Sequence, residues 1–410
     1  MMSQDACTEL ERPAYTCPLG GREMHKFVSR CYQQLTPDPQ PSQNFFQLMP
    51  GFLAFRLLSI FLRRAESRPI SPIASNLCDS VLEHWPDIWK WLKCANIACR
   101  NPRKCLYFLN DHDHCALFSS IAMFIRDCCL HEHPLHQKVR STTIGIVVDL
   151  WYYQLRRPHR YLDPGSCTLQ VLADWSYRKT AAEGCDNGPP LVINRIGRPV
   201  EEIASVMLRF LEYHISSTTT DSEPIVCHVR FMAHLSTYSN FRNALMTVHS
   251  MHIVTRALVH LSYKMMSSPE LNSNHCRRVR DGLFMYLLHT FLDMEGIVPI
   301  RRCMEAGLLL AVLRGGACDR GDDGEQLALL VSSICPYLVY LSILRAASRS
   351  LAKVDLVRME ERMDRQGKFW QSWILLKAIL LDRFLLLPSG IPKRCDNNEV
   401  SFVFLVKCIT

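Results

Sequence analysis

EEIASVMLRFLEYHI, residues 201–215, decides the fold class, because its apolar side chains recur every three or four positions. That spacing places them along one side of a helix. Two glutamates stand in the first turn, where the helix dipole favours negative charge. The stretch therefore predicts an amphipathic helix. Its stripe consists of Ile203, Val206, Met207, Phe210, Leu211 and His214.

The same helical spacing extends through most of the chain. Before residue 400 there is no run of alternating β-branched residues next to an Asn-Gly or Asp-Gly turn, so no strand is predicted there. Ser71-Pro72 and Ser268-Pro269 are typical helix starts, because serine can cap the first turn and proline suits the first helical position. Further helices are predicted over 241–263, 275–292, 299–314, 325–348 and 350–387.

These patterns predict an all-α fold with a short extended C-terminal tail. Helix-turn units of roughly 40 residues are typical of an armadillo-like or HEAT-like array, in which neighbouring units bury each other's apolar faces. No unit aligns with another residue by residue. An irregular helical bundle is therefore the alternative.

Proline and glycine are frequent in residues 159–198, which indicates a boundary between two helical parts. Few periodic apolar residues precede residue 43, apart from one short helix expected near Lys26–Leu35. The expected organisation is a flexible tail over 1–42, a helical subdomain over 43–158, a linker over 159–198, a second helical subdomain over 199–390, and a terminal segment over 391–410.

The composition argues against several classes of protein. Of the 410 residues 48% are hydrophobic and 21% are charged, so the chain can bury a large core, unlike a disordered chain. The two most apolar stretches, 44–62 and 372–388, contain charged residues, and we expect no membrane span. The net charge of +8 is a weak nucleic-acid signal. Local basic clusters are expected to be solvated helix faces: Arg277, Arg278 and Arg280, and Arg156 and Arg157.

Cysteine is unusually frequent, with 19 copies. The first residues lack a secretory signal, so we expect reduced thiols in the cytoplasm or the nucleus, most of them acting as small buried hydrophobes. The densest region of cysteine and histidine spans 94–136, but its gaps match no common zinc finger, and zinc there is the minority hypothesis. Its members are Cys94, Cys99, Cys105, His112, His114, Cys115, Cys128, Cys129, His131, His133 and His136.

The stretch HWPDIWKWL, residues 84–92, contains three tryptophans. Trp85 and Trp89 are four residues apart and share a helix face, which Ile88 and Leu92 continue. We interpret this face as core packing between two helices. A ligand cage is the alternative.

Motifs of common catalytic sites are missing: there is no G-x-S-x-G, G-x-x-x-x-G-K-[ST], G-x-G-x-x-G or H-E-x-x-H. We therefore expect no catalytic residue. The alternative is a helical enzyme with its site between helices, using His228, His234 or His289 as a general base. A small-molecule substrate cannot be named from the sequence.

The last stretch, KRCDNNEVSFVFLVKCIT over 393–410, follows a proline and glycine break. It resembles the junction in fungal helical proteins that end in a MYND-type zinc finger, as does the WPDIWKW stretch. The resemblance implies Cys395 as a first zinc ligand and Cys408 as the start of the second pair. Two thiolates cannot close a tetrahedral site. We therefore expect a truncated or degenerate finger, with zinc bound only in a longer form. A plain extended tail that packs on the body is the alternative.

Taken together, these features predict a non-catalytic interaction scaffold inside the cell. The resemblance implies protein partners, because fingers of that family bind proline-containing peptides. No cofactor is expected in the chain itself. The helical enzyme and a weak nucleic-acid binder are the alternative functions.

Overall fold

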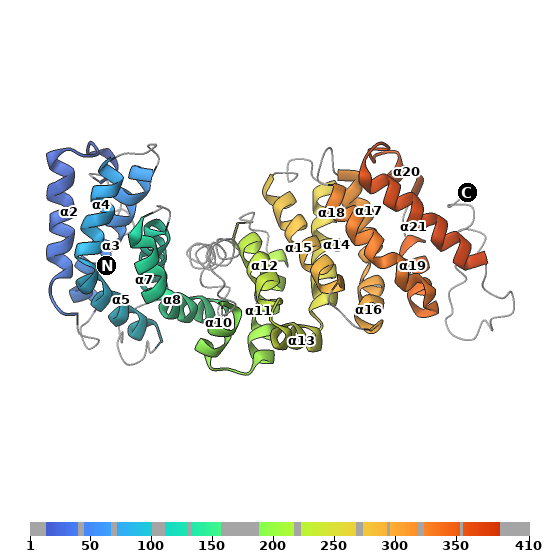
Figure 1. The fold of residues 1–410 in the computed structure, drawn as a ribbon, viewed down its shortest axis with the longest axis horizontal. Coiled ribbons are helices and arrows are strands. Elements are labelled where there is room, and N and C mark those ends of the chain that lie inside the picture. The colour runs from blue at the N-terminus through green and yellow to red at the C-terminus, as the bar shows by residue number, and fades with distance from the viewer. Residues whose placement is uncertain are drawn as a thin grey trace. The chain divides into compact units, whose positions relative to one another are not determined.

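The computed structural model describes residues 14–39, 45–66, 72–100, 111–129, 133–156, 188–216, 223–267, 274–292, 296–318, 324–352 and 356–385. Within these ranges every regular element is a helix and no strand occurs, which confirms the all-α prediction (Figure 1). The predicted tail after residue 390 lies outside the described residues. Within the described ranges, no helix combines the length and the hydropathy that a membrane span requires.

The chain forms two compact units, Met1–Arg198 and Pro199–Thr410. The division falls where the predicted linker ends. The helices of the first unit are α2 (Arg22–Leu35), α3 (Phe45–Glu66), α4 (Pro72–Glu83), α5 (Trp85–Arg100), α7 (Asp111–Cys128), α8 (Pro134–Leu155) and α10 (Gly188–Ile196).

The core of the first unit surrounds α3, which contacts α2, α4 and α7. Phe55 of α3 and Phe124 of α7 are both fully buried, and their ring centroids are 5.1 Å apart. Helix α8 in turn contacts α4, α5, α7 and α10. Among the described helices, α10 packs mainly on α8.

The short helix expected near Lys26–Leu35 is confirmed by α2, which begins four residues earlier at Arg22 and buries Met24, Val28 and Leu35. The indole N–H of Trp91 in α5 donates to the carbonyl of Leu35 at 2.9 Å and ties the end of α2 to the core. Pattern reasoning underestimated this helix because long polar side chains separate its few apolar positions.

The tryptophan stretch lies in the core, as predicted, but its buried face is only partly the predicted one. Trp85, Ile88 and Leu92 are buried, and Trp91 is buried with them. Trp89 is only half-buried, with the ammonium of Lys93 5.5 Å from its ring centroid.

Gly51 of α3 explains how closely Trp91 approaches. A Cβ at this position would overlap the Trp91 ring, which also meets Phe52 edge-on. Glycine inside a helix costs about 1 kcal/mol relative to alanine. Here it gives the indole room to pack directly on the α3 backbone.

The second unit begins with α11 (Val200–Ser216), which confirms the helix predicted over 201–215. The other helices are α12 (Glu223–Leu235), α13 (Ser239–Thr247), α14 (Ser250–Ser267), α15 (Asn274–Leu292), α16 (Val298–Ala306), α17 (Leu308–Cys318), α18 (Gly324–Ile334), the 3-10 helix η4 (Cys335–Val339), α19 (Leu341–Leu351), α20 (Leu356–Glu360) and α21 (Lys368–Leu385).

Helices in the second unit pack on the helix three places further along the chain. One row consists of α12, α15, α18 and α21; a second consists of α11, α14, α17 and α20; and a third consists of α16 and α19. Figure 1 shows α14, α15, α17 and α18 side by side. The helices of the first row begin at residues 223, 274, 324 and 368, so the packing pattern repeats every 44 to 51 residues. A helical array is therefore confirmed. Its repeat consists of three helices, whereas the sequence predicted a helix-turn repeat of roughly 40 residues.

Four of the predicted long helices are wrong in the same way, because each divides into two. The helix predicted over 241–263 breaks at His249, whose φ is +62°, and the one over 299–314 breaks at Gly307, whose φ is +98°. The helix over 325–348 divides around η4, where Pro336 cannot supply a backbone N–H. The helix over 350–387 divides between α20 and α21. The prediction over 275–292 is confirmed by α15.

A buried tryptophan joins the last two helices. The indole N–H of Trp373 in α21 donates to Oε1 of Glu360 in α20 at 2.7 Å, and Lys377 donates to the same oxygen at 2.8 Å. Trp373 is fully buried. The carboxylate therefore satisfies two donors at the point where the chain turns from α20 into α21.

Candidate functional site

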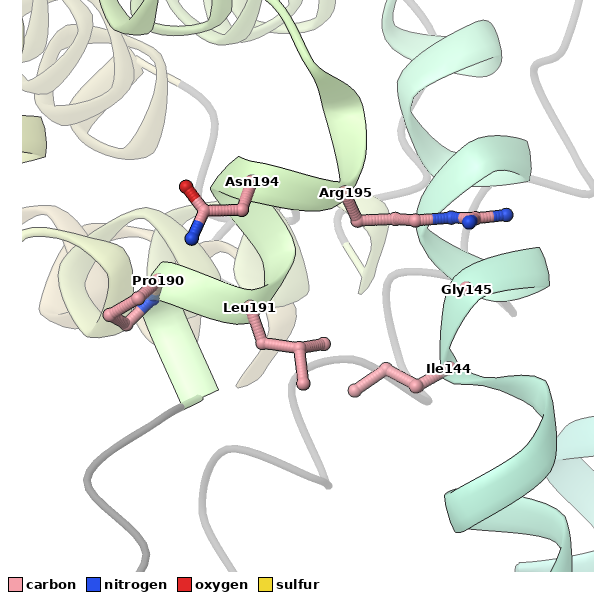
Figure 2. A pocket seen from close by; sticks show the side chains of 6 residues that line it. All are labelled: Ile144, Gly145, Pro190, Leu191, Asn194 and Arg195. Carbon is pink, nitrogen blue, oxygen red and sulfur yellow. The ribbon is translucent and has the colours of Figure 1, made fainter.

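A hollow of about 640 Å³ opens between α8 and α10 in the first unit. Its apolar part is formed by Ile144 of α8 and by Pro190 and Leu191 of α10. Figure 2 shows the side chains of Leu191 and Ile144 facing each other across the hollow. Leu191 is 42% exposed, so a large apolar side chain here faces solvent.

One side of this hollow, which we call the α8–α10 groove, is polar. The guanidinium of Arg195 donates to the carboxylate of Asp149 at 2.9 Å, and the amide of Asn96 donates to the same oxygen at 3.2 Å. The Asp149 side chain is largely buried, whereas that of Arg195 is nearly half-exposed. The ion pair therefore fixes the guanidinium on α8 while part of it remains open to solvent.

Gly145 leaves room on α8 for the side chain of Arg195. A Cβ at Gly145 would lie 3.0 Å from Nε and 3.3 Å from a terminal nitrogen of Arg195. Figure 2 shows Arg195 reaching from α10 across α8 next to Gly145. The absent side chain lets the arginine lie flat on the helix backbone.

The sequence predicted a linker where α10 lies, and that prediction is wrong for residues 188–196. The consecutive prolines at 189 and 190 read as a helix break. In the structure they occupy the first turn, where proline loses no intrahelical hydrogen bond and its fixed φ suits the helix. The groove residues were consequently not among the predicted site residues.

The described residues of the groove are mainly apolar, with a few polar groups beside them. The described lining residues supply one guanidinium, one amide and three apolar side chains, and among them is no nucleophile or general base. The carboxylate of Asp149, which pairs with Arg195, accepts hydrogen bonds from Arg195 and Asn96. Such a lining favours docking of an apolar side chain next to a polar contact.

A second, more polar hollow of about 340 Å³ lies between α2 and the residues that end α4. The rings of Tyr32 and His84 stack there, with centroids 3.8 Å apart, and Nδ1–H of His84 donates to the carbonyl of Ser80 at 2.9 Å. Burial raises the pKa of the Tyr32 phenol well above its usual range. The stacked rings pack α2 against the end of α4.

The histidine and cysteine region over 94–136 assembles no metal site among the described residues. Cys94, Cys128 and Cys129 are buried, and burial raises the pKa of the Cys128 thiol well above its usual value. His133 caps α8 by accepting the N–H of Leu135 and lies 3.3 Å from Asp79. The side chains of Cys99, Cys105, His112, His114, Cys115 and His131 lie outside the described residues.

Elsewhere too, the described cysteines behave mainly as small hydrophobic side chains, as predicted. Eight of the eleven are buried, and burial raises the pKa of Cys31, Cys78 and Cys303 to about 12. A thiol with such a pKa is protonated at neutral pH, and the thiolate is the form that binds metal or attacks a substrate. The proposed zinc ligands Cys395 and Cys408 lie outside the described residues.

A fully buried carboxylate pins α3 to α7. Asp127 accepts hydrogen bonds from Nε and a terminal nitrogen of Arg126 at 2.9 and 2.7 Å, from Arg63 at 3.1 Å, and from the hydroxyl of Ser59. Neither hollow includes it. Its role is structural.

The three histidines of the enzyme hypothesis do not converge. His228 is fully buried, His234 is half-buried and His289 is exposed, and neither hollow contains any of them. Nε2–H of His228 donates to the carbonyl of Met207 at 3.0 Å. Burial lowers the pKa of His228 to about 3, with His214 adding a smaller repulsion. An imidazole with that pKa is a weak base.

This buried imidazole predicts a pH dependence of stability. His228 is neutral in the folded protein down to about pH 3, whereas the unfolded chain takes up a proton below about pH 6.5. The free energy of unfolding should therefore fall as the pH falls from about 6.5, by up to about 1.4 kcal/mol per pH unit from this residue. Urea unfolding of the wild type and of His228→Phe, at several pH values in this range, measures the slope. His289→Phe, an exposed histidine of the same unit, should keep the wild-type slope, and an equal slope in all three proteins would contradict the assignment.

The prediction that Arg277, Arg278 and Arg280 form a solvated helix face is wrong for Arg280. Arg280 is buried, and its guanidinium lies 2.8 Å from the carboxylate of Asp281. Arg278 is exposed and Arg277 half-buried. In the other cluster Arg156 is exposed at the end of α8, and Arg157 lies outside the described residues.

Comparison with known proteins assigns the chain to no family. No protein-family model, no curated protein and no solved structure matches it. The resemblance to MYND-type proteins stays a hypothesis. The α8–α10 groove is the site on which a function can be argued.

Proposed function

We propose that the protein is a non-catalytic interaction scaffold whose α8–α10 groove binds an apolar side chain of a protein partner. The observation that carries this proposal is Leu191, which stands 42% exposed opposite Ile144 in an open hollow. Burying one leucine-sized side chain contributes about 1.5–3 kcal/mol. Covering Leu191 with an apolar side chain of a partner would therefore offset part of the cost of association.

The polar side of the groove supports a protein partner in particular. Arg195 is held by Asp149 but keeps an exposed edge, so its remaining N–H groups can donate to backbone carbonyls or a carboxylate of a bound segment. A peptide segment offers both an apolar side chain for Leu191 and Ile144 and backbone carbonyls for the Arg195 guanidinium. Small peptide segments satisfy both requirements.

The resemblance of residues 395–408 to a MYND-type finger would make proline-containing segments the preferred partners. Zinc would bind only in a longer form with further ligands beside Cys395 and Cys408. We place the scaffold in the cytoplasm or the nucleus, as the cysteine-rich composition suggests.

The test compares co-purified proteins for the wild type, Leu191→Glu and Leu292→Glu. Leu292 is the matched control, because it is a leucine exposed to 67% on α15 of the other unit. Quantitative mass spectrometry should show partners retained by the wild type and by Leu292→Glu and reduced about tenfold or more in Leu191→Glu, since a charge replaces the apolar side chain that the partner would cover. Equal recovery by all three proteins, with unchanged melting temperatures, would contradict the proposal.

Weak nucleic-acid binding, the alternative, predicts retention on a polyanion that falls steeply with salt. The burial of Arg280 removes one of its candidate contacts. No observation on the described residues favours it over the scaffold.

A further inference from the structure

Helix α21 carries two apolar stripes, although only one is buried. Phe369, Trp373, Leu376 and Leu380 form the buried stripe. The second stripe is Ile374, Leu375, Ala378 and Leu381, at helical spacing; Ile374 is 41% exposed and Leu375 is 54% exposed. A helix that is apolar on both sides is normally covered on both sides.

The position of α21 in its row explains why this second stripe matters. In the same row α15 lies between α12 and α18, and α18 lies between α15 and α21. Among the described helices α21 has a row neighbour on one side, α18. A helix at the end of such an array needs a cover or a polar outer face.

We infer that the chain's own residues 400–406, VSFVFLV, bind the exposed stripe of α21 and cap the array. This segment consists of apolar residues apart from Ser401, and its alternate positions Val400, Phe402, Phe404 and Val406 are all apolar. Left in water, such a run favours aggregation. Covering α21 removes two unfavourable apolar surfaces at once.

The connection is long enough for this contact. Fourteen residues, 386–399, separate the end of α21 at Leu385 from Val400. They can span up to about 46 Å at about 3.3 Å per residue. Helix α21, with 18 residues, is about 27 Å long. The apolar segment can thus return along the whole exposed stripe.

The tether also favours this occupant over a second copy of the chain. A short linker gives its attached segment an effective concentration in the millimolar range. A contact of a few apolar side chains is populated under those conditions, whereas a separate molecule at ordinary protein concentration would leave the stripe open.

The test places a photo-crosslinking residue in the full-length chain at Leu375, as Leu375→p-benzoylphenylalanine. After irradiation, peptide mapping should find adducts to residues 400–406 at the mass of a single chain. Phe402→Asp combined with Phe404→Asp should lower their yield about tenfold or more, because two charges replace the apolar contacts. Ser401→Asp, in the same segment, should leave the yield within about twofold of the wild type.

Two control measurements accompany this test. The same photo-residue at Val298 on α16, which is 47% exposed, should give several-fold fewer adducts to residues 400–406. Circular dichroism should show that all variants keep their helix content. Adducts at a doubled mass would assign the stripe to a second copy, and adducts to other segments or none to residues 400–406 would also overturn the proposal.

Discussion

Replacing Asp127 with alanine is expected to lower the free energy of unfolding of the first unit by about 3–5 kcal/mol. The fully buried carboxylate accepts hydrogen bonds from Arg126, Arg63 and Ser59. Its removal takes this acceptor away from the partly buried Arg126 guanidinium and from the buried Ser59 hydroxyl, and breaking a buried ion pair costs far more than losing a contact at the surface. Urea unfolding followed by far-ultraviolet circular dichroism measures the change.

Asp79→Ala is the matched control. Asp79 lies in the same unit and pairs with His133 at 3.3 Å, but its side chain is 64% exposed. A pair whose carboxylate is this exposed to solvent contributes about 0–1 kcal/mol, so this variant should remain close to the wild type. Similar losses in the two variants would show that the Asp127 network does not hold α3 and α7 together.

Replacing Trp373 with alanine should lower the free energy of unfolding of the second unit by about 3–5 kcal/mol. The side chain is fully buried in α21, and its indole N–H donates to Glu360. Alanine leaves a large cavity and removes one of the two donors to that carboxylate. Thermal and urea unfolding, with Trp370 and the other tryptophans as fluorescent reporters, measure the loss.

Trp370→Ala provides the comparison within the same helix. Trp370 is half-buried, and the guanidinium carbon of Arg365 lies 5.7 Å from its ring centroid. Its loss removes less buried area, and we expect about 1 kcal/mol. A larger effect at Trp370 than at Trp373 would contradict the described packing of α21.

Apolar periodicity predicted the helices α11 and α15 nearly to the residue but could not predict where longer helices break. Histidine adopts positive φ more often than most other side chains, but so rarely that the residue alone does not predict the break at His249. In the structure, a contact between His249 and Arg302 of α16 accompanies the break. Contacts of this kind arise only after the chain has folded.

The groove could not be predicted for a related reason. Asp149 is 46 residues from Arg195 and 53 residues from Asn96 in sequence, and no local pattern joins them. The prolines before Leu191 pointed to a loop, although they equally suit a helix start. A search for Pro-Pro followed by apolar residues at helical spacing could have found α10.

The regular stacking of the second unit has a consequence for how the protein folds and evolves. Since each helix packs on one only three helices away, native contacts join segments close in sequence, and ordering can begin at several places and spread to its neighbours. Chains of this kind tolerate gain or loss of a whole module of about 50 residues without rebuilding the rest. Heat or mechanical force should melt them progressively from an extremity inward.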